Sequence, residues 1–370
     1  MSTHSDTDVL SAVQRGDLNW LEKYTSENEV DWRTCIHRKS GDTALHIAAV
    51  AGCTQIMSWL LANGCDVCLE KQNMDGKRPL HSAAQAMHFP IVKILLDHGA
   101  TVDPIKRGDW TPLMLACAKR CLKVIQLLVE HGANLRWVNK DGWTSFLIAC
   151  REGFECIVNY LLDVDSSLWN TVSNNGRTPL HTAAMHGHES VVKILLHRGN
   201  YKKDEDDACG NTPLMEAFRM GHLNIARLLI IEHGTDIKVR DKTGRTAFHI
   251  AAEAGQLESV KTLIETYGVD VNLLSDAGSS AVHCAAREGQ TEVVVFLIKM
   301  GCKVSIKDNN GRTALWMACA SRKNTCAKKL VDFGAQDIAD NKGISPSQLM
   351  PIYHLSPVTL PNTEDLFSTS

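Results

Sequence analysis

Apolar and polar positions follow one pattern that recurs along most of the chain. Each recurrence begins with a motif related to Thr-Pro-Leu-His, continues with small residues such as alanine, and ends in an apolar run with helical spacing, as in PIVKILLDHG and HESVVKILLHRG. Successive motifs are 33 to 35 residues apart. The pattern predicts nine structural repeats with two helices each. The motifs begin at Thr43, Arg78, Thr111, Thr144, Thr178, Thr212, Thr246, Ser280 and Thr313.

The residue types within each repeat predict its local structure. A threonine or serine before the first helix can cap it through the side-chain oxygen, and a proline at the first helical position loses only an N–H that is unpaired there. Alanines let the two helices approach closely, and the Ile, Val and Leu face packs against the neighbouring repeat. We expect the glycines that end eight of the apolar runs to adopt a left-handed conformation. These are Gly64, Gly99, Gly132, Gly199, Gly234, Gly268, Gly301 and Gly334.

With these motifs and this spacing, the sequence resembles the ankyrin repeats. The resemblance implies an all-α fold, a solenoid of paired antiparallel helices with turn or hairpin tips. We expect residues 1–40 to form a degenerate N-terminal capping repeat, residues 41–340 to form nine clear repeats, and residues 341–370 to form a C-terminal cap and a largely disordered tail rich in Pro, Ser and Thr. The end repeats need a polar outer face because one side has no neighbour.

Composition narrows the class of protein and its surroundings. The formal net charge of −3 argues against attraction of the whole protein to nucleic acid or an anionic membrane. The N-terminus lacks the layout of a secretory signal, and no apolar run is long enough to span a bilayer. Thirteen cysteines without framework spacing indicate free thiols in a reducing compartment. We therefore expect a cytoplasmic and nuclear protein.

Residues that could support catalysis or metal binding have simpler interpretations. The histidines of the TALH, RPLH, TPLH, TAFH and SAVH motifs are interpreted as structural, bonding across turns between repeats. Cys65 and Cys68 have the C-x-x-C spacing, but no second pair completes four metal ligands, so they too are interpreted as structural. Phosphate-binding and hydrolase motifs are absent. The sequence predicts no enzyme, no catalytic residue, no metal and no cofactor.

Basic and aromatic residues gather in repeats three and four. PIKRGDWTPL carries Lys106, and LRWVNKDGWTSF carries Lys140, each close to tryptophans. Aromatic and arginine side chains dominate binding hot spots, and cations can lie over indole rings. We predict a protein-binding surface here, with the alternative that the lysines are merely solvated and the indoles pack locally. The predicted partner-binding residues are Trp110, Trp143, Arg107, Trp137, Lys119, Arg120 and Arg151.

Nucleic acid is a second partner class that such a surface could suit, because bases stack on indoles while phosphates meet Lys and Arg. The acidic neighbours Asp103, Asp109 and Asp141 oppose this interpretation. We therefore expect a protein partner, no direct nucleic-acid contact and no membrane contact, and a monomeric chain.

Three segments carry a narrower resemblance within the family. GDWTPLM, KDGWTSF and RTPLHTAAMHGH, between about residues 41 and 335, are similar to ankyrin repeat proteins that are co-regulators of alanyl-tRNA synthetase. The resemblance implies binding to the catalytic region of that synthetase. It further implies that lysine side chains accept wrongly activated serine, which protects translational fidelity by preventing mischarging of alanine tRNA.

The acceptor positions implied by this resemblance are partly retained. Lys140 matches one of them. A second falls on Arg107, which supplies no neutral amine, so the adjacent Lys106 would substitute. A third aligns with Asn170, which has no amine. Lys140 and Lys106 are thus the serine acceptor candidates. The alternative function is a generic ankyrin-repeat adaptor with a different protein partner.

Overall fold

The computed structural model describes residues 5–350, and their regular structure is helical apart from isolated β-bridges such as the one between Lys106 and Trp110. The predicted all-α class is therefore confirmed. The chain forms two compact units that divide between Cys209 and Gly210. The tail expected over the last residues, from 351 onward, lies outside the described residues.

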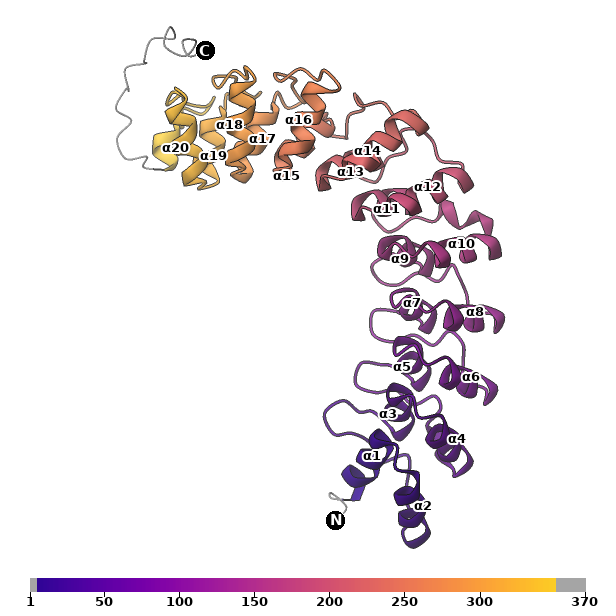
Figure 1. The fold of residues 1–370 in the computed structure, drawn as a ribbon. Helices are drawn as coiled ribbons and strands as arrows, with labels where there is room; N and C mark the ends of the chain where they lie inside the picture. The colour runs from indigo at the N-terminus through magenta and orange to yellow at the C-terminus, as the bar shows by residue number, and fades with distance from the viewer. Residues whose placement is uncertain (1–4, 351–370) are drawn as a thin grey trace, which may run out of the picture. The chain divides into compact units, whose positions relative to one another are not determined.

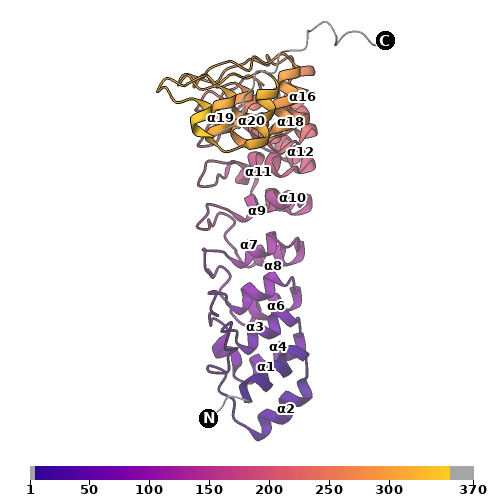
Figure 2. The ribbon, with the colours of Figure 1, turned by 90° about the vertical axis from the view of Figure 1, so that its left-hand side faces the viewer.

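Unit 1 is a stack of helix pairs joined by hairpin tips. Its first helices follow one another in one row, its second helices form a second row, and the tips line one edge (Figures 1 and 2). The unit begins with the helix pair α1 (Ser5–Arg15) and α2 (Leu18–Glu27). The other elements of unit 1 are α3 (Ala44–Ala51), α4 (Thr54–Ala62), η1 (Cys65–Cys68), α5 (Pro79–Gln85), α6 (Phe89–Asp97), α7 (Pro112–Cys117), α8 (Leu122–Glu130), α9 (Ser145–Glu152), α10 (Glu155–Val164), η2 (Ser166–Asn170), α11 (Pro179–His186) and α12 (Glu189–Arg198).

Unit 2 has the same helix pairing, and its last described element is a short helix. That helix, α21 (Pro346–Leu349), packs against α19. A π-helix, η3 (Leu229–His233), follows α14 without a break. The other elements are α13 (Pro213–Met220), α14 (Leu223–Leu228), α15 (Ala247–Ala254), α16 (Leu257–Glu265), α17 (Ala281–Glu288), α18 (Thr291–Lys299), α19 (Ala314–Ala320) and α20 (Asn324–Asp332).

The capping residues and histidines at the start of the first helices form the hydrogen bonds that the motifs predict. Thr111 accepts a hydrogen bond from the backbone N–H of Met114 at 3.3 Å. His46 accepts from the N–H of Thr43 through Nδ1, and its Nε2 donates to the carbonyl oxygen of Lys77 at 2.8 Å. Because Lys77 belongs to the next hairpin, this histidine links two repeats, and its predicted structural role is confirmed.

The glycines that end the second helices are left-handed with one exception. Seven of the eight have φ between +65° and +90°. The prediction for Gly199 is wrong, since its φ is −97°. A Cβ atom at Gly199 would lie 2.5 Å from the ring of Tyr201, so this glycine makes room for an aromatic side chain.

Candidate functional site

The tip of repeat three is a tight hairpin that holds Lys106 and Trp110 together. The N–H of Lys106 donates to the carbonyl oxygen of Trp110 at 3.1 Å, and the N–H of Asp109 donates back to Lys106 at 2.9 Å. The turn requires left-handed backbone at Gly108 and at Asp109, where φ is +61°. Repeat two fixes its position, because Arg107 donates to the carbonyl oxygens of Asp75 and Met74, each at 3.1 Å.

This hairpin places the Lys106 amine over an indole. Its Nζ lies 5.7 Å from the centre of the Trp110 ring, within the range of a cation–π contact. Partial burial, followed by the nearby charge of Lys77, lowers the pKa of Lys106 below its ordinary value. A larger fraction of this amine is therefore unprotonated at neutral pH than for a free lysine.

The tip of repeat four is organised around the buried side chain of Asn139. Its Oδ1 accepts hydrogen bonds from the N–H groups of Asp141 at 3.0 Å and Trp143 at 2.8 Å. The N–H of Lys140 donates to the carbonyl oxygen of Gly108, at 3.1 Å, which joins this tip to the previous one. The Lys140 side chain is exposed, so a backbone held by hydrogen bonds presents this amine to solvent.

Trp143 has a cationic neighbour of its own. The guanidinium carbon of Arg151 lies 5.4 Å from the centre of the indole, and the Trp143 side chain remains half-buried. Arg151 also pairs with Glu152 at 2.6 Å, which neutralises part of its charge. Two consecutive repeats thus each carry a tryptophan beneath a basic group.

The basic residues after α7 extend this surface. Lys119 and Arg120 are both exposed, and Arg120 adopts a left-handed φ of +58°. Its guanidinium lies over Phe154, with 5.4 Å between the guanidinium carbon and the ring centre. Sequence reasoning missed Phe154, although it lies 34 residues before His188 and thus at the same place in the repeat.

The remaining tryptophans of this region lie away from the two tips. Trp137 precedes the repeat-four hairpin and is half-buried, and its Nε1 is buried without a hydrogen-bond partner among the described residues. Trp169 meets Tyr201 edge-on at 5.2 Å and accepts a hydrogen bond from the Tyr201 hydroxyl at its carbonyl oxygen. Trp169 therefore packs locally, while the predicted contact of Trp137 with a partner stays a prediction.

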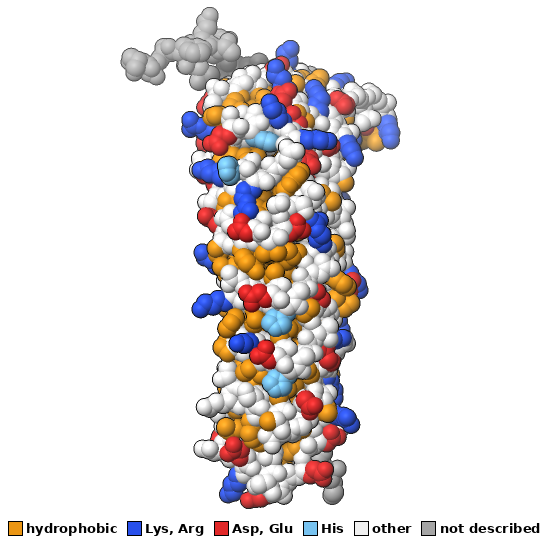
Figure 3. Space-filling view, turned by 90° about the vertical axis from the view of Figure 1, so that its right-hand side faces the viewer, with side chains coloured by type: hydrophobic (Ala, Val, Ile, Leu, Met, Phe, Trp, Pro, Cys, Tyr) orange, Lys and Arg blue, Asp and Glu red, His pale blue; other side chains and the backbone are white. Residues whose placement is uncertain are grey.

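The opposite face of unit 1, formed by the second helices, has a different character. Figure 3 shows basic and acidic side chains interspersed there among apolar ones. Cations paired with indoles are found instead at the tips of repeats three and four, together with the adjacent helix ends.

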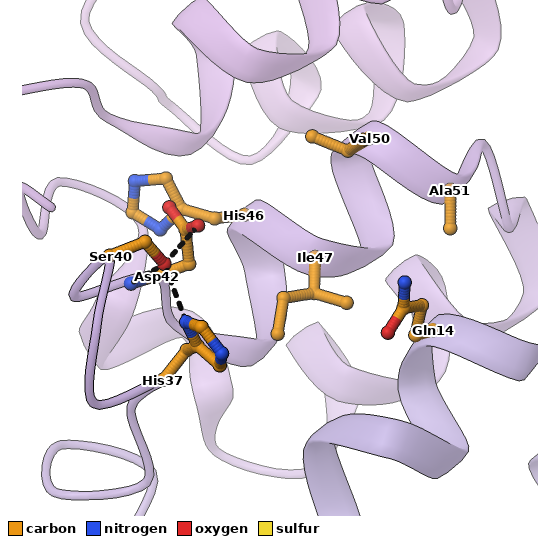
Figure 4. A pocket seen from close by; sticks show the side chains of 8 residues that line it. All are labelled: Gln14, His37, Ser40, Asp42, His46, Ile47, Val50 and Ala51. Carbon is orange, nitrogen blue, oxygen red and sulfur yellow. Dashed lines mark hydrogen bonds between the residues drawn. The ribbon is translucent and has the colours of Figure 1, made fainter. Parts of the chain in front are cut away.

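One tip in unit 1 carries the three residue types of a hydrolytic triad, but in the wrong order. The Ser40 hydroxyl donates to Asp42 at 2.5 Å, and His37 Nδ1 lies 2.9 Å from the same hydroxyl oxygen (Figure 4). A triad needs the imidazole between serine and carboxylate. Here the serine lies between them and its proton is engaged by Asp42, so the arrangement does not activate a nucleophile.

The part of the chain that the structure describes contains neither a metal-binding cluster nor a membrane-spanning helix. Over residues 5–350, no group of three or more His, Cys, Asp or Glu side chains could hold a metal ion, and no helix is long and apolar enough to cross a membrane. Cys65 and Cys68 are buried, and the Cys68 thiol donates to the carbonyl oxygen of Trp32 at 3.1 Å. This contact fits their structural interpretation.

Comparison with protein families finds one family model that matches these repeats. A family model for ankyrin repeats (3 copies) matches residues 9–106, 103–171, 164–241, 200–275, 230–308 and 248–342, which together cover most of the chain.

Three relatives match over shorter stretches. Ankyrin repeat-containing protein ITN1 of Arabidopsis thaliana is 35% identical over 118 residues, which is 27% of this chain and 20% of that protein. Protein phosphatase 1 regulatory subunit 12A of Mus musculus is 37% identical over 71 residues, or 19% of this chain and 7% of that protein. Transient receptor potential cation channel subfamily A member 1 of Homo sapiens is 30% identical over 110 residues, or 29% and 9%. The chain thus spans at most a fifth of the length of these relatives.

Proposed function

The chain belongs to the ankyrin repeat family, and from this premise we propose that it binds the catalytic region of alanyl-tRNA synthetase and accepts misactivated serine on lysine side chains. Ankyrin repeats are protein-interaction modules and are generally not enzymes. Membership of the family therefore indicates a protein partner, but it does not identify that partner. The choice of synthetase is supported by the resemblance of GDWTPLM, KDGWTSF and RTPLHTAAMHGH to ankyrin repeat domain-containing protein 16.

The observation that carries the proposal is the pair of cation–indole contacts on consecutive tips. Lys106 over Trp110 and Arg151 over Trp143 belong to hairpins joined by the hydrogen bond from Lys140 to Gly108. Half-buried indoles beside basic groups form the kind of surface that anchors a protein partner. This tip surface, defined by Lys106, Arg107, Trp110, Lys140, Trp143 and Arg151, is the proposed docking site.

The proposed acceptor reaction needs only a neutral amine beside the activated serine. The lysine nitrogen attacks the carbonyl carbon of seryl-adenylate, the bond from that carbon to the phosphate oxygen breaks, and AMP leaves. The amine loses its proton to solvent, and a stable amide remains on the lysine. Docking raises the effective concentration of the amine, and each lysine is consumed once.

Replacing Trp143 by alanine tests the docking site. We expect Trp143→Ala to weaken binding of the alanyl-tRNA synthetase catalytic region by at least about tenfold in a titration, because the loss of a central indole typically costs about 2 kcal/mol. Trp316→Ala is the matched control, since Trp316 in unit 2 also lies beneath an arginine, Arg312, at 5.3 Å. Equal affinities of the two variants would contradict the proposal.

The second candidate function is an adaptor for a different protein. The docking site would serve it equally well, because nothing in docking requires a reactive amine. A synthetase that does not bind the unaltered chain, while another protein binds in a Trp143-dependent way, would favour this alternative. For either function we propose a monomer located in the cytoplasm and nucleus.

A further inference from the structure

A hollow of about 460 Å³ lies at the first tip of unit 1, apart from the docking site. One wall is polar and is formed by His37, Ser40 and Asp42 of the hairpin (Figure 4). Across from it, α3 contributes Ile47 and Val50. The hollow therefore offers a carboxylate and an aliphatic wall to the same ligand.

Asp42 is held as an anion by hydrogen bonds, and not by an ion pair with any residue that the structure describes. Its Oδ1 accepts from the Asn73 side chain at 2.7 Å, and its Oδ2 accepts from Ser40 at 2.5 Å. Burial opposes ionisation, but these hydrogen bonds outweigh it and lower the pKa of Asp42 below its ordinary value. No lysine or arginine within residues 5–350 forms an ion pair with this carboxylate.

The aliphatic wall is exposed to an unusual degree. Val50 is 60% exposed, in a helix whose other aliphatic residues mostly face the core. On the neighbouring repeat, the tip residue Met74 is 58% exposed and Met87, after α5, is 48% exposed. Exposed apolar side chains beside a half-buried anion suit a partner side chain that combines an aliphatic stem with a positive charge.

The hollow continues toward the docking site. A second hollow of about 390 Å³ shares Ser40, Asp42 and Val50 with the first and extends to Lys119. It also passes Lys77, whose amine pairs at 3.9 Å with Asp75, another residue of the lining. The groove thus changes from anionic at repeat one, through an ion pair at repeat two, to cationic at repeat three. Adjacent helices are roughly 10 Å apart, so two repeats span about 20 Å, which an extended segment of about seven residues covers.

We propose that this groove binds an extended protein segment whose arginine or lysine pairs with Asp42, whose aliphatic residues lie on Ile47 and Val50, and whose acidic residues face Lys119. The inference rests on the proposed function in one respect: the segment belongs to the partner that the docking site holds. It adds the charge order that the partner segment must have.

Two fluorescein-labelled, blocked peptides test the inference with the full chain. One has the sequence GRLVAEE, and the other, GQLVAEE, lacks the positive charge. We expect the arginine peptide to bind about tenfold more tightly in an anisotropy titration. In Asp42→Asn the two peptides should bind equally, whereas in the control Asp97→Asn, at an exposed position on α6, the difference should persist.

A second pair of variants tests the aliphatic wall. Val50→Ser should weaken both peptides several-fold, and Val164→Ser, which alters an equally simple side chain that is 47% exposed on α10, should weaken neither. Equal binding of the two peptides to the unaltered chain, a peptide difference that survives Asp42→Asn, or no saturable binding up to about 1 mM would each overturn the inference.

The outcome separates this inference from the proposed function. If the arginine peptide depends on Asp42 but the synthetase does not bind, the groove is supported and the choice of synthetase fails. If the synthetase binds in a Trp143-dependent way and the peptides do not bind, the groove inference fails alone.

Discussion

At the scale of single residues, the two candidate acceptor lysines have different environments although they occupy successive tips. Lys106 is half-buried over Trp110, and burial together with Lys77 lowers its pKa. Lys140 is exposed and is held only through its backbone. Lys106 therefore gains reactivity from its surroundings, whereas Lys140 gains access to a docked partner.

The lowered pKa of Lys106 can be read from its acylation rate. Only the neutral amine reacts, so the rate rises with pH and levels off above the pKa. With an N-hydroxysuccinimide ester and peptide-level mass spectrometry, we expect the Lys106 rate to level off at a lower pH than the rate of Nα-acetyl-lysine amide, whose pKa is about 10.4. A Lys106 midpoint equal to or above that of the model compound would contradict the assigned environment.

The residues of the docking site were predictable from the sequence, but their surroundings were not. Residue type and repeat position identified Trp110 and Trp143 as candidates. The sequence could not show that Trp169 packs on Tyr201, because that contact joins adjacent repeats 32 residues apart. It also could not show the effect of Lys77 on Lys106, for the same reason.

At the scale of elements, the hairpin tips are positioned by contacts with one another. The Lys140 carbonyl oxygen accepts a hydrogen bond from the Asn174 side chain at 3.1 Å, and the Lys140 N–H donates to Gly108. Each tip is thus held between its two neighbours. A change at one tip is expected to displace the side chains of the next.

Two glycines with nearly the same backbone conformation distinguish the contact between neighbouring tips from simple backbone strain. Gly132 and Gly142 have φ of +83° and +81°, but a Cβ atom at Gly132 meets open space, and one at Gly142 overlaps the backbone of Asn174. We expect Gly132→Ala to cost about 1 kcal/mol of unfolding free energy and Gly142→Ala about 3 kcal/mol or more. Urea titrations measure both, and equal costs would show that the tips are not held against each other.

Protonation of the buried histidines is expected to lower the stability of the folded chain in acid. Burial lowers the pKa of His81 and His249 to about 4, below about 6.5 in the unfolded chain. Since the unfolded state takes up the proton first, their stabilising contribution is complete above pH 6.5 and is lost as the pH falls toward 4. At pH 5 the loss is about 2 kcal/mol per histidine.

Urea titrations at pH 7.5 and pH 5.0 measure this loss. His249→Gln removes one titrating group, so the variant should lose about 2 kcal/mol less than the unaltered chain between the two pH values. An unchanged pH dependence in this variant would show that His249 does not titrate as its burial indicates.

Helix pairs, caps and the bonding role of the histidines followed from the repeated motif, because each repeat makes the same local contacts. Two details departed from the motif. Gly199 is extended to accommodate Tyr201, and the second helix after α13 ends in a π-helix, η3. The apolar run before Gly234 predicts a helix there, but not the wider π-helical turn.

At the scale of the whole molecule, the repeats provide a scaffold on which few positions are specialised. Each repeat is stabilised mainly by its neighbours, so exposed tip residues can vary without loss of the fold. Repeats three and four carry indoles and cations at these positions, and repeat one carries Asp42, a carboxylate that forms no ion pair within residues 5–350. A net charge of −3 leaves these local patches, rather than the total charge, to select a partner.

We propose that lysines at these tips capture serine activated by the synthetase. The most direct test is intact and peptide-level mass spectrometry after incubation with alanyl-tRNA synthetase, serine and ATP. We expect a serine-sized adduct at Lys140 or Lys106 that requires the synthetase, disappears in the double variant Lys106→Arg and Lys140→Arg, and persists in the control Lys303→Arg. No adduct at either lysine, with the synthetase bound, would contradict it and leave a docking protein without acceptor chemistry.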